Sequence, residues 1–387
     1  MIKRAIEPEF RMLLLEYPVV TILGPRQAGK TTLARNVLPD YAYRNLELPH
    51  LREFATRDPR GFLAEAGAPV ILDEIQRVPE LLSYLQDAVD AHPNQNGQYV
   101  LTGSHQLALR AAIAQSLAGR TGILYLLPLA LTELSRGVLR RGFPELAQTG
   151  FLPRIHAEHL RSWHTYANYY QTYIERDVRQ FIHLKDAMLF DKFMRLLAGR
   201  AGQIVNRSSL GNDVGVSAKT IDHWLSILEA SFVIFRLPPY FENFGKRVIK
   251  SPKLFFCDVG LLVYLLGIEK PEQVSRDPLV GGIFENFVIA ECLKNERNQG
   301  RAPRLYFFRD NKGLEVDLIF ADARRLYGVE IKASSTPRSD HFSGLKAFHD
   351  NVHSLERNTV VYQGPSQNYS DGSRHLSIMD IPKIFAC

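Results

Sequence analysis

Cysteine is scarce in this sequence, and the three cysteines lie far apart. Cys257, Cys292 and Cys387 have neither the spacing of a metal site nor that of a disulfide framework. We therefore expect reduced thiols in a cytoplasmic protein. Long apolar runs are also missing, because no stretch approaches the roughly 18 residues that cross a membrane. Internal repeats and low-complexity tracts are absent, and we expect no signal peptide at the start of the chain.

No single kind of residue dominates the composition. Hydrophobic residues make up 45% and charged residues 23%, which is typical of soluble globular proteins. The formal net charge of +6 favours a polyanionic partner only slightly, since a phosphate site would use part of it. The chain of 387 residues exceeds the roughly 250–300 residues at which a single core stops growing. Two or three domains are therefore expected.

Apolar, β-branched runs alternate with helical patterns in the first part of the chain. Four runs predict buried parallel strands, at residues 18–23, 69–72, 98–102 and 123–127. Helices should follow the first two, and this alternation predicts an open α/β sheet. The pattern changes after Pro144. We place soft domain boundaries near residues 150 and 255, which gives domains at 1–150, 151–255 and 256–387.

The first expected strand ends in a glycine-rich loop. Residues 24–31 read Gly-Pro-Arg-Gln-Ala-Gly-Lys-Thr, which fits the Walker A pattern Gly-x-x-x-x-Gly-Lys-Thr. The glycines let backbone N–H groups approach phosphates at the N-terminus of the next helix. Lys30 supplies a positive charge for the phosphates, and the Thr31 hydroxyl can ligate magnesium. We therefore expect ATP and Mg²⁺ to bind here, with contacts from Gly24, Pro25, Arg26, Gln27, Ala28, Gly29, Lys30, Thr31 and Thr32.

Polar residues follow the second and third expected strands. Asp73 and Glu74 close an apolar run; we expect Asp73 to hold magnesium through water and Glu74 to polarise the attacking water. A solvated strand end is the alternative. Thr102 and Ser104 end the third strand, where they either sense the γ-phosphate or form a plain turn. The sequence therefore predicts ATP hydrolysis at this edge of the sheet.

Six motifs of the chain carry a family resemblance: residues 24–31, Leu-Asp-Glu-Ile-Gln at 72–76, Leu-Thr-Gly-Ser at 101–104, Ala-Gly-Arg at 118–120, Gly-Phe-Pro-Glu at 142–145 and Tyr-Ile-Glu-Arg-Asp at 173–177. Together they resemble those of prokaryotic AAA-type ATPases that carry a C-terminal domain of unknown function. The resemblance covers nearly the whole chain and implies an ATP-binding AAA-type core without a cellular role. An arginine near the γ-phosphate would stabilise the transition state, and Arg120 and Arg176 are the candidates; a surface role is the alternative for both.

The middle segment predicts a helix-turn-helix. Residues 207–230 contain two short helical patterns around a turn, and Ser217 is a good N-cap for the second. A strand pair should follow, and the whole resembles a winged helix that contacts DNA or packs against a protein partner. The buried stripe of the second helix would consist of Ile221, Trp224, Leu225 and Leu228. Its outward face would carry Ala218, Lys219, Thr220 and His223. The basic wing would consist of Lys246, Arg247, Lys250 and Lys253.

Four residues of the last segment occur in the order of a nuclease-like site. Glu285 lies on an expected helix, Asp317 at the end of Glu-Val-Asp on a strand, and Glu330 and Lys332 on one face of the next strand. Their carboxylates could share magnesium, with Lys332 positioning water. This pattern resembles the restriction-endonuclease-like α/β fold. The alternative is a strand hairpin with incidental charges, and such a fold does not by itself imply cutting.

The sequence thus predicts an AAA-type P-loop ATPase with a parallel sheet, a helical and winged-helix middle, and a restriction-endonuclease-like α/β end. The leading hypothesis is ATP hydrolysis with Mg²⁺ coupled to DNA or other nucleic-acid binding or remodelling. An ATP-gated DNA-binding regulator with an inert nuclease-like domain, and a signalling ATPase that binds protein, are the alternatives. Magnesium-dependent nuclease activity stays open, as does an oligomer; no membrane association is expected.

Overall fold

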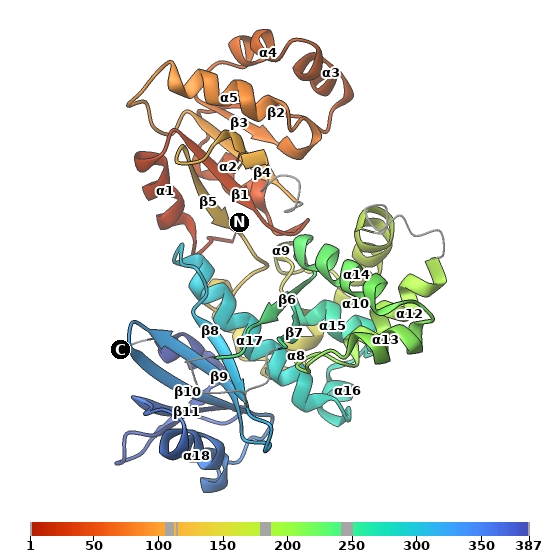
Figure 1. The fold of residues 1–387 in the computed structure, drawn as a ribbon, viewed down its shortest axis with the longest axis vertical. Helices are drawn as coiled ribbons and strands as arrows, with labels where there is room; N and C mark the ends of the chain where they lie inside the picture. Colours follow the sequence, from red (N-terminus) through yellow and green to blue (C-terminus); the bar gives the residue numbers. More distant parts are fainter. Residues whose placement is uncertain (1, 105–111, 114, 179–186, 241–250, 386–387) are drawn as a thin grey trace. The chain divides into compact units, whose positions relative to one another are not determined.

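The computed structural model describes residues 2–104, 112–113, 115–178, 187–240 and 251–385. The chain forms two compact units (Figure 1). Unit 1 contains Met1–Leu129 and two short later segments, Ala230–Phe232 and Arg297–Arg301. Unit 2 contains Ala130–Glu229, Val233–Glu296 and Ala302–Cys387.

A five-stranded parallel sheet is the centre of unit 1. Its strand order is β2-β3-β4-β1-β5. Every residue of β1, β3 and β4 is buried, as expected for parallel strands with both faces covered by helices. The elements are α1 (Glu7–Glu16), β1 (Val19–Leu23), α2 (Lys30–Val37), β2 (Ala42–Asn45), α3 (Pro49–Arg57), α4 (Pro59–Ala66), β3 (Val70–Asp73), the 3-10 helix η1 (Ile75–Arg77), α5 (Leu81–Asp90), β4 (Tyr99–Gly103) and β5 (Thr121–Tyr125).

All four strands expected in this region are present, and the helices α2 and α5 follow the first two. The last strand begins and ends two residues before the expected 123–127. The strand β2 is not predicted, because each of its residues is only half-buried and it has no apolar run.

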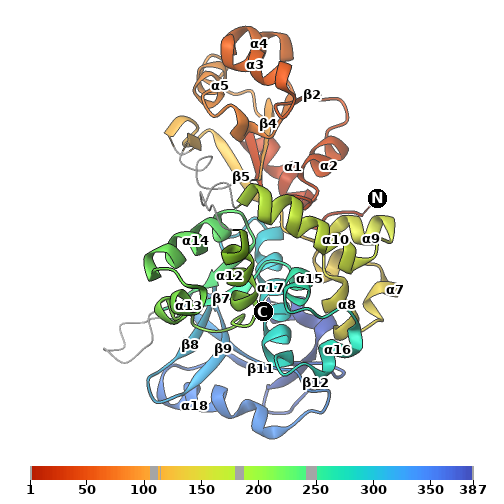
Figure 2. The same cartoon turned by 90° about the vertical axis from the view of Figure 1, so that its right-hand side faces the viewer.

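Unit 2 begins with helices. In both views α12, α13 and α14 lie together (Figure 2). The α13–α14 pair is the expected helix-turn-helix, and Ile221, Trp224, Leu225 and Leu228 are its buried stripe. The helical elements are η2 (Leu131–Glu133), α7 (Arg136–Leu139), α8 (Phe143–Thr149), α9 (Pro153–Glu158), α10 (Ser162–Tyr169), the π-helical η3 (Tyr170–Val178), α12 (Ala187–Ala198), α13 (Arg207–Val214), α14 (Ala218–Ala230), α15 (Val259–Leu265) and α16 (Pro271–Arg276).

Two sheets complete unit 2. The strands β6 (Ile234–Leu237) and β7 (Lys253–Phe256) form an antiparallel pair. The larger sheet is mixed and has the order β12-β13-β11-β10-β9-β8; β8, β9 and β10 are antiparallel neighbours, and β11 runs parallel to β10. Its elements are α17 (Val280–Asn298), β8 (Leu305–Arg309), β9 (Glu315–Asp322), β10 (Arg325–Lys332), η5 (Ser339–Phe342), α18 (Ser343–Asn351), β11 (Arg357–Tyr362), β12 (Gln367–Asn368), β13 (Arg374–Ser377) and η6 (Ile378–Phe385).

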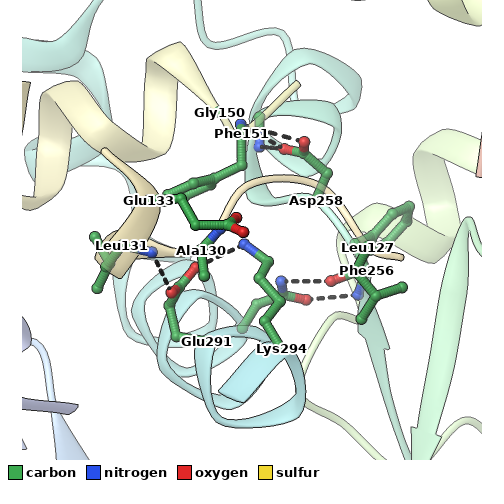
Figure 3. Close-up of polar contacts among 12 residues, drawn as sticks. Leu127, Ala130, Leu131, Glu133, Gly150, Phe151, Phe256, Asp258, Glu291 and Lys294 are labelled. Carbon is green, nitrogen blue, oxygen red and sulfur yellow. Dashed lines mark hydrogen bonds and ion pairs between the residues drawn. The ribbon is translucent and has the colours of Figure 1, made fainter. Parts of the chain in front are cut away.

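Buried polar contacts fasten α17 within unit 2 (Figure 3). The Glu291 carboxylate accepts hydrogen bonds from the Leu131 N–H at 2.8 Å and from the Lys294 ammonium at 2.6 Å. The side chain of Asn286 exchanges two hydrogen bonds with the backbone of Phe256 on β7. This exchange fixes α17 against β7 directly beside Glu285. None of the helices in the described part of the chain combines the length and hydropathy of a membrane span.

Candidate functional site

Two glycines determine the path of the loop between β1 and α2. A Cβ atom at Gly24 would lie 2.0 Å from the carbonyl oxygen of Leu126, so only glycine fits there. Gly29 precedes α2 with a φ of +90°, in the left-handed region that favours glycine. The loop therefore turns tightly onto the N-terminus of α2, where the backbone N–H groups and the helix dipole favour an anion.

Lys30 is the first residue of α2 and is buried against this loop. Its ammonium group donates to the carbonyl oxygens of Gly24 at 3.0 Å and Pro25 at 2.8 Å. Burial lowers the pKa of Lys30 to about 8, although the carboxylates of Glu74 and Asp73 oppose the shift. An anion beside this poorly solvated ammonium group would stabilise its charged form. Lys30 therefore has both the position and the chemistry to bind phosphate.

Arg4 holds the loop from outside the Walker A motif. Its guanidinium group donates to the carbonyl oxygen of Ala28 at 2.7 Å and to that of Leu127 at 2.7 Å. The side chain is buried. The sequence gives no signal for this residue, because both acceptors belong to the backbone and any side chain at those positions would offer the same carbonyl.

Asp73 ends β3 and lies beside Thr31. The Thr31 hydroxyl donates to the two carboxylate oxygens of Asp73 at 2.9 and 3.0 Å. Tyr43 donates to the same carboxylate at 2.7 Å, and Thr102 also donates to it. Burial raises the pKa of Tyr43, so its hydroxyl keeps the proton that it donates. Thr31 and Asp73 thus present neighbouring oxygens of the kind that Mg²⁺ prefers.

Glu74 has a left-handed backbone, with φ +58° and ψ +45°. A non-glycine residue keeps this conformation only where its surroundings hold it. Its N–H donates to the Thr102 hydroxyl at 3.2 Å, and its carboxylate accepts from Ser104 at 3.3 Å and from the side-chain amide of Gln76. Both expected sensor residues therefore contact the acidic pair. Gln76 has no role in the sequence prediction, although it lies in one of the quoted motifs.

The other expected nucleotide contacts lie in the loop or in the first turn of α2. Gln27 has a positive φ of +62°, and Ala28 is fully buried. Arg26 forms an ion pair with Glu47 at 3.8 Å, and Thr32 is exposed.

Arg120 does not reach this loop within its own chain. It immediately precedes β5, and its carbonyl oxygen accepts from the N–H of Val19 at the start of β1. The phosphate loop follows the opposite end of β1, and the two strands are parallel. The Arg120 guanidinium group is paired with Asp90 at 2.6 Å. The structure therefore places Arg120 away from the phosphate loop of its own chain. Its catalytic role stays a prediction, which would need a nucleotide on a neighbouring subunit. The side chain of Arg176 lies outside the described part of the chain.

The C-terminal sheet brings three of the four expected residues into contact. The Lys332 ammonium lies 2.7 Å from the Glu330 carboxylate and 3.8 Å from that of Asp317. The Asp317 carboxylate also accepts from the Ile331 N–H at 2.8 Å, which joins β9 to β10. Burial and the neighbouring Asp317 raise the pKa of Glu330.

Glu285, the fourth residue, contacts Lys253, which the sequence predicts to lie in the basic wing. The Lys253 ammonium lies 2.8 Å from Glu285 and 2.6 Å from Glu315. Burial raises the pKa of Glu285, and so does the nearby carboxylate of Asp317, while Lys253 lowers it. The expected placement of Lys253 in an exposed basic wing is wrong, because only 4% of its side chain is exposed.

The structure describes the part of the expected DNA-contacting surface that lies on α14. Lys219 and His223 are exposed on α14, whereas Ala218 and Thr220 are half-buried. Ser217 caps this helix as expected, because its hydroxyl accepts from the Thr220 N–H at 3.1 Å. Lys246, Arg247 and Lys250 lie outside the described residues.

Three families match successive parts of the chain. Residues 16–135 match an AAA domain, residues 133–272 a Domain of unknown function (DUF8612), and residues 280–384 a Domain of unknown function (DUF4143). The AAA match covers the parallel sheet, the phosphate loop and the acidic pair. This chain carries an AAA-type P-loop ATPase domain at residues 16–135. The comparisons leave the C-terminal part without an assigned fold or activity, so its restriction-endonuclease-like character stays a prediction.

Relatives of this chain match well beyond its AAA domain. The uncharacterized protein Rv2008c of Mycobacterium tuberculosis is 33% identical over 346 residues, covering 87% of this chain and 75% of that protein. An uncharacterized protein of Haemophilus influenzae is 25% identical over 326 residues, covering 80% and 76%. Among solved structures, the Walker-type ATPase PABY2304 of Pyrococcus abyssi is 17% identical with a TM-score of 0.42, covering 68% of this chain and 96% of that one.

Proposed function

We propose that this ATPase hydrolyses ATP with Mg²⁺ and that Glu74 polarises the attacking water. The observation that carries the proposal is the arrangement of the two acids at the end of β3. Asp73 is held beside Thr31, while Ser104 and Gln76 direct the carboxylate of Glu74. Two carboxylates with separate partners, next to a phosphate-binding lysine, can divide metal binding and proton transfer between them.

Each residue of the site has a distinct task in this proposal. The ammonium group of Lys30 and the N–H groups of the loop bind and orient the phosphates. Thr31 and Asp73 hold the magnesium ion, which would neutralise charge on the phosphate oxygens. Glu74 accepts a hydrogen bond from the water and draws its proton. Thr102 fixes the positions of the two acids relative to each other, because its one hydroxyl donates to Asp73 and accepts from the Glu74 N–H.

Two substitutions separate binding from turnover. Lys30→Ala should lose nucleotide binding, because Lys30 contacts phosphate before the reaction begins. Glu74→Gln should keep binding and lose about 10²- to 10⁴-fold in turnover, the usual effect of removing a positioned base. Calorimetric titration with ATP and a phosphate-release assay measure the two quantities.

The matched control is Glu80→Gln, which makes the same chemical change at an exposed residue soon after the acidic pair. Its turnover should equal that of the wild type. Normal turnover in the Glu74→Gln protein would remove Glu74 from the mechanism, whatever the nucleotide affinity of that variant.

We also propose that nucleic acid is the partner to which ATP turnover is coupled. The supporting observations are the net charge of +6 and the exposed Lys219 and His223 on the second helix of the helix-turn-helix. The inward orientation of Lys253 leaves a smaller basic surface than the sequence predicts. A protein partner is the competing hypothesis, and a binding experiment with DNA distinguishes the two.

A further inference from the structure

Four carboxylates of unit 2 form an acidic cluster, made of Glu285, Glu315, Asp317 and Glu330. We infer that Lys253 is a built-in counter-ion of this acidic cluster and that the C-terminal domain works without a divalent metal. Lys253 belongs to β7, a strand of the preceding segment of the chain, rather than to the larger sheet.

The contacts of Lys253 are those of an internal cation. Its ammonium group bridges Glu285 at 2.8 Å and Glu315 at 2.6 Å. The ring of Phe307 lies 5.5 Å from the same nitrogen, within range of a cation–π contact. Burial alone lowers the pKa of Lys253, but the carboxylates of Glu285, Asp317 and Glu315 outweigh burial and raise it. Lys253 is therefore charged throughout the physiological range.

The acidic cluster has further positive partners. Lys332 lies between Glu330 at 2.7 Å and Asp317 at 3.8 Å. The Arg309 guanidinium lies 3.5 Å from the second oxygen of Glu315. Each carboxylate therefore has a cation of the protein within 4 Å. Three cations of the protein thus offset most of the charge that a metal would have to neutralise.

These contacts do not fit a bound Mg²⁺ or Mn²⁺. Such ions need several carboxylate oxygens turned toward one point. Here one oxygen of Glu285 is taken by Lys253, and the Asp317 oxygen near Lys332 already accepts from the Ile331 N–H. A divalent cation would also lie beside two ammonium groups and be repelled by them. Throughout the described residues, no three His, Cys, Asp or Glu side chains are grouped to hold a metal ion.

The position of Lys253 is defined by its surroundings. Asn286, the residue after Glu285, exchanges two hydrogen bonds with Phe256 on the strand of Lys253. The helix that carries Glu285 and the strand that carries Lys253 are therefore held together by these side-chain-to-backbone hydrogen bonds as well as by the ion pair. An ammonium group held in this way remains in the cluster rather than moving aside for an ion.

The first experiment compares nucleotide-free wild type with Asp317→Asn. Calorimetric titration with Mn²⁺ should give the same weak heats for both proteins. EDTA should leave the thermal unfolding temperature of the wild type unchanged, and neither protein should cut DNA with Mg²⁺ or Mn²⁺. Stoichiometric Mn²⁺ binding, or DNA cleavage, that is present in the wild type and lost in Asp317→Asn would overturn the inference.

The second experiment removes the counter-ion. Lys253→Met keeps an unbranched side chain of nearly the same length and deletes its charge, so the carboxylates should repel one another and the unfolding temperature should fall. Added Mn²⁺ should restore it, because the ion can now take the vacated position. Lys312→Met makes the same change at an exposed lysine in the turn between β8 and β9 and should show neither effect.

A double variant covers the case in which Lys253→Met does not fold. Lys253→Met with Glu315→Gln removes one cation and one carboxylate together, and should be more stable than Lys253→Met alone. If Mn²⁺ raises the unfolding temperature of Lys253→Met no more than that of Lys312→Met, or if the double variant is no more stable than the single one, Lys253 is not the counter-ion.

Discussion

Lys30 determines how the phosphate site responds to pH. Its pKa of about 8 lies far below the ordinary lysine value, because the side chain is buried. A bound phosphate favours the ammonium form and raises this pKa. Nucleotide affinity should therefore be constant below pH 8 and should fall by about tenfold for each pH unit above it, until the pKa of the complex is reached.

Proton uptake provides the measurement. Calorimetric titration with ADP in buffers of different ionisation enthalpy should show no proton absorbed at pH 7 and close to one absorbed at pH 9. The same affinity at both pH values, with no proton uptake at pH 9, would mean that Lys30 is already fully charged without nucleotide.

Sequence identifies residues that act through their own functional groups at a fixed spacing. Lys30, Thr31 and Asp73 follow from the Walker pattern and from an apolar strand that ends in acids, and the structure brings them together. Arg4 and Tyr43 act by reaching across the fold to a carbonyl or a carboxylate, so no local pattern marks them. Their roles can be assigned only from the three-dimensional positions of β2, which carries Tyr43, and of the residues before α1, which include Arg4.

At the scale of elements, α14 is the part of the chain that carries the nucleic-acid proposal. Each phosphate contact releases counter-ions, so the affinity for DNA should fall steeply as salt rises. Lys219→Ala should weaken binding and make the slope of log affinity against log salt shallower by about one, the change expected for the loss of one phosphate contact. Fluorescence anisotropy with a labelled duplex at several salt concentrations measures both.

Lys270→Ala is the matched control, because Lys270 is exposed but precedes α16 rather than lying on α14. Its salt slope should equal that of the wild type. Absence of DNA affinity in the wild type at low salt would favour the protein-partner hypothesis.

Elements are predictable where burial imposes a pattern. The runs that become β1, β3 and β4 are apolar throughout because both faces of these strands are covered. Half-buried β2 has no such run. Alternation on a strand predicts which residues share a face, but not which face packs against the core. The sequence alone therefore predicts Lys253 as a surface residue of a wing, because it does not show the neighbours of Lys253 on α17 and β9.

At the scale of the whole molecule, the ATPase unit is not one continuous stretch. It includes Ala230–Phe232 and Arg297–Arg301, which follow Leu129 after gaps of 100 residues or more. The ring of Tyr125 on β5 lies 6.2 Å from that of Phe232 and 4.2 Å from the guanidinium carbon of Arg297. A Cβ atom at Gly300 would lie 2.4 Å from the Glu9 carboxylate on α1. Both late segments are therefore packed parts of the unit.

Loss of the Arg297 contact should loosen β5. A cation–π contact contributes about 0.5–2 kcal/mol, so Arg297→Ala in the full chain should speed amide hydrogen exchange of β5 by about twofold to thirtyfold. Arg301→Ala, a change at an exposed arginine of the same segment, should leave this exchange unchanged. Equal exchange rates in the Arg297→Ala and wild-type proteins would show that the contact does not stabilise the strand.

The late segments have a consequence for how such a gene can recombine. A crossover that joins codons 1–129 to an unrelated downstream sequence would transfer the phosphate loop and both acids, yet would leave behind two pieces of the unit that holds them. The recipient would gain the phosphate loop and the acidic pair without the packing of Phe232 and Arg297 on Tyr125 of β5. Lineages that keep this ATPase should therefore tend to inherit it together with the sequence up to residue 301, as a single heritable block.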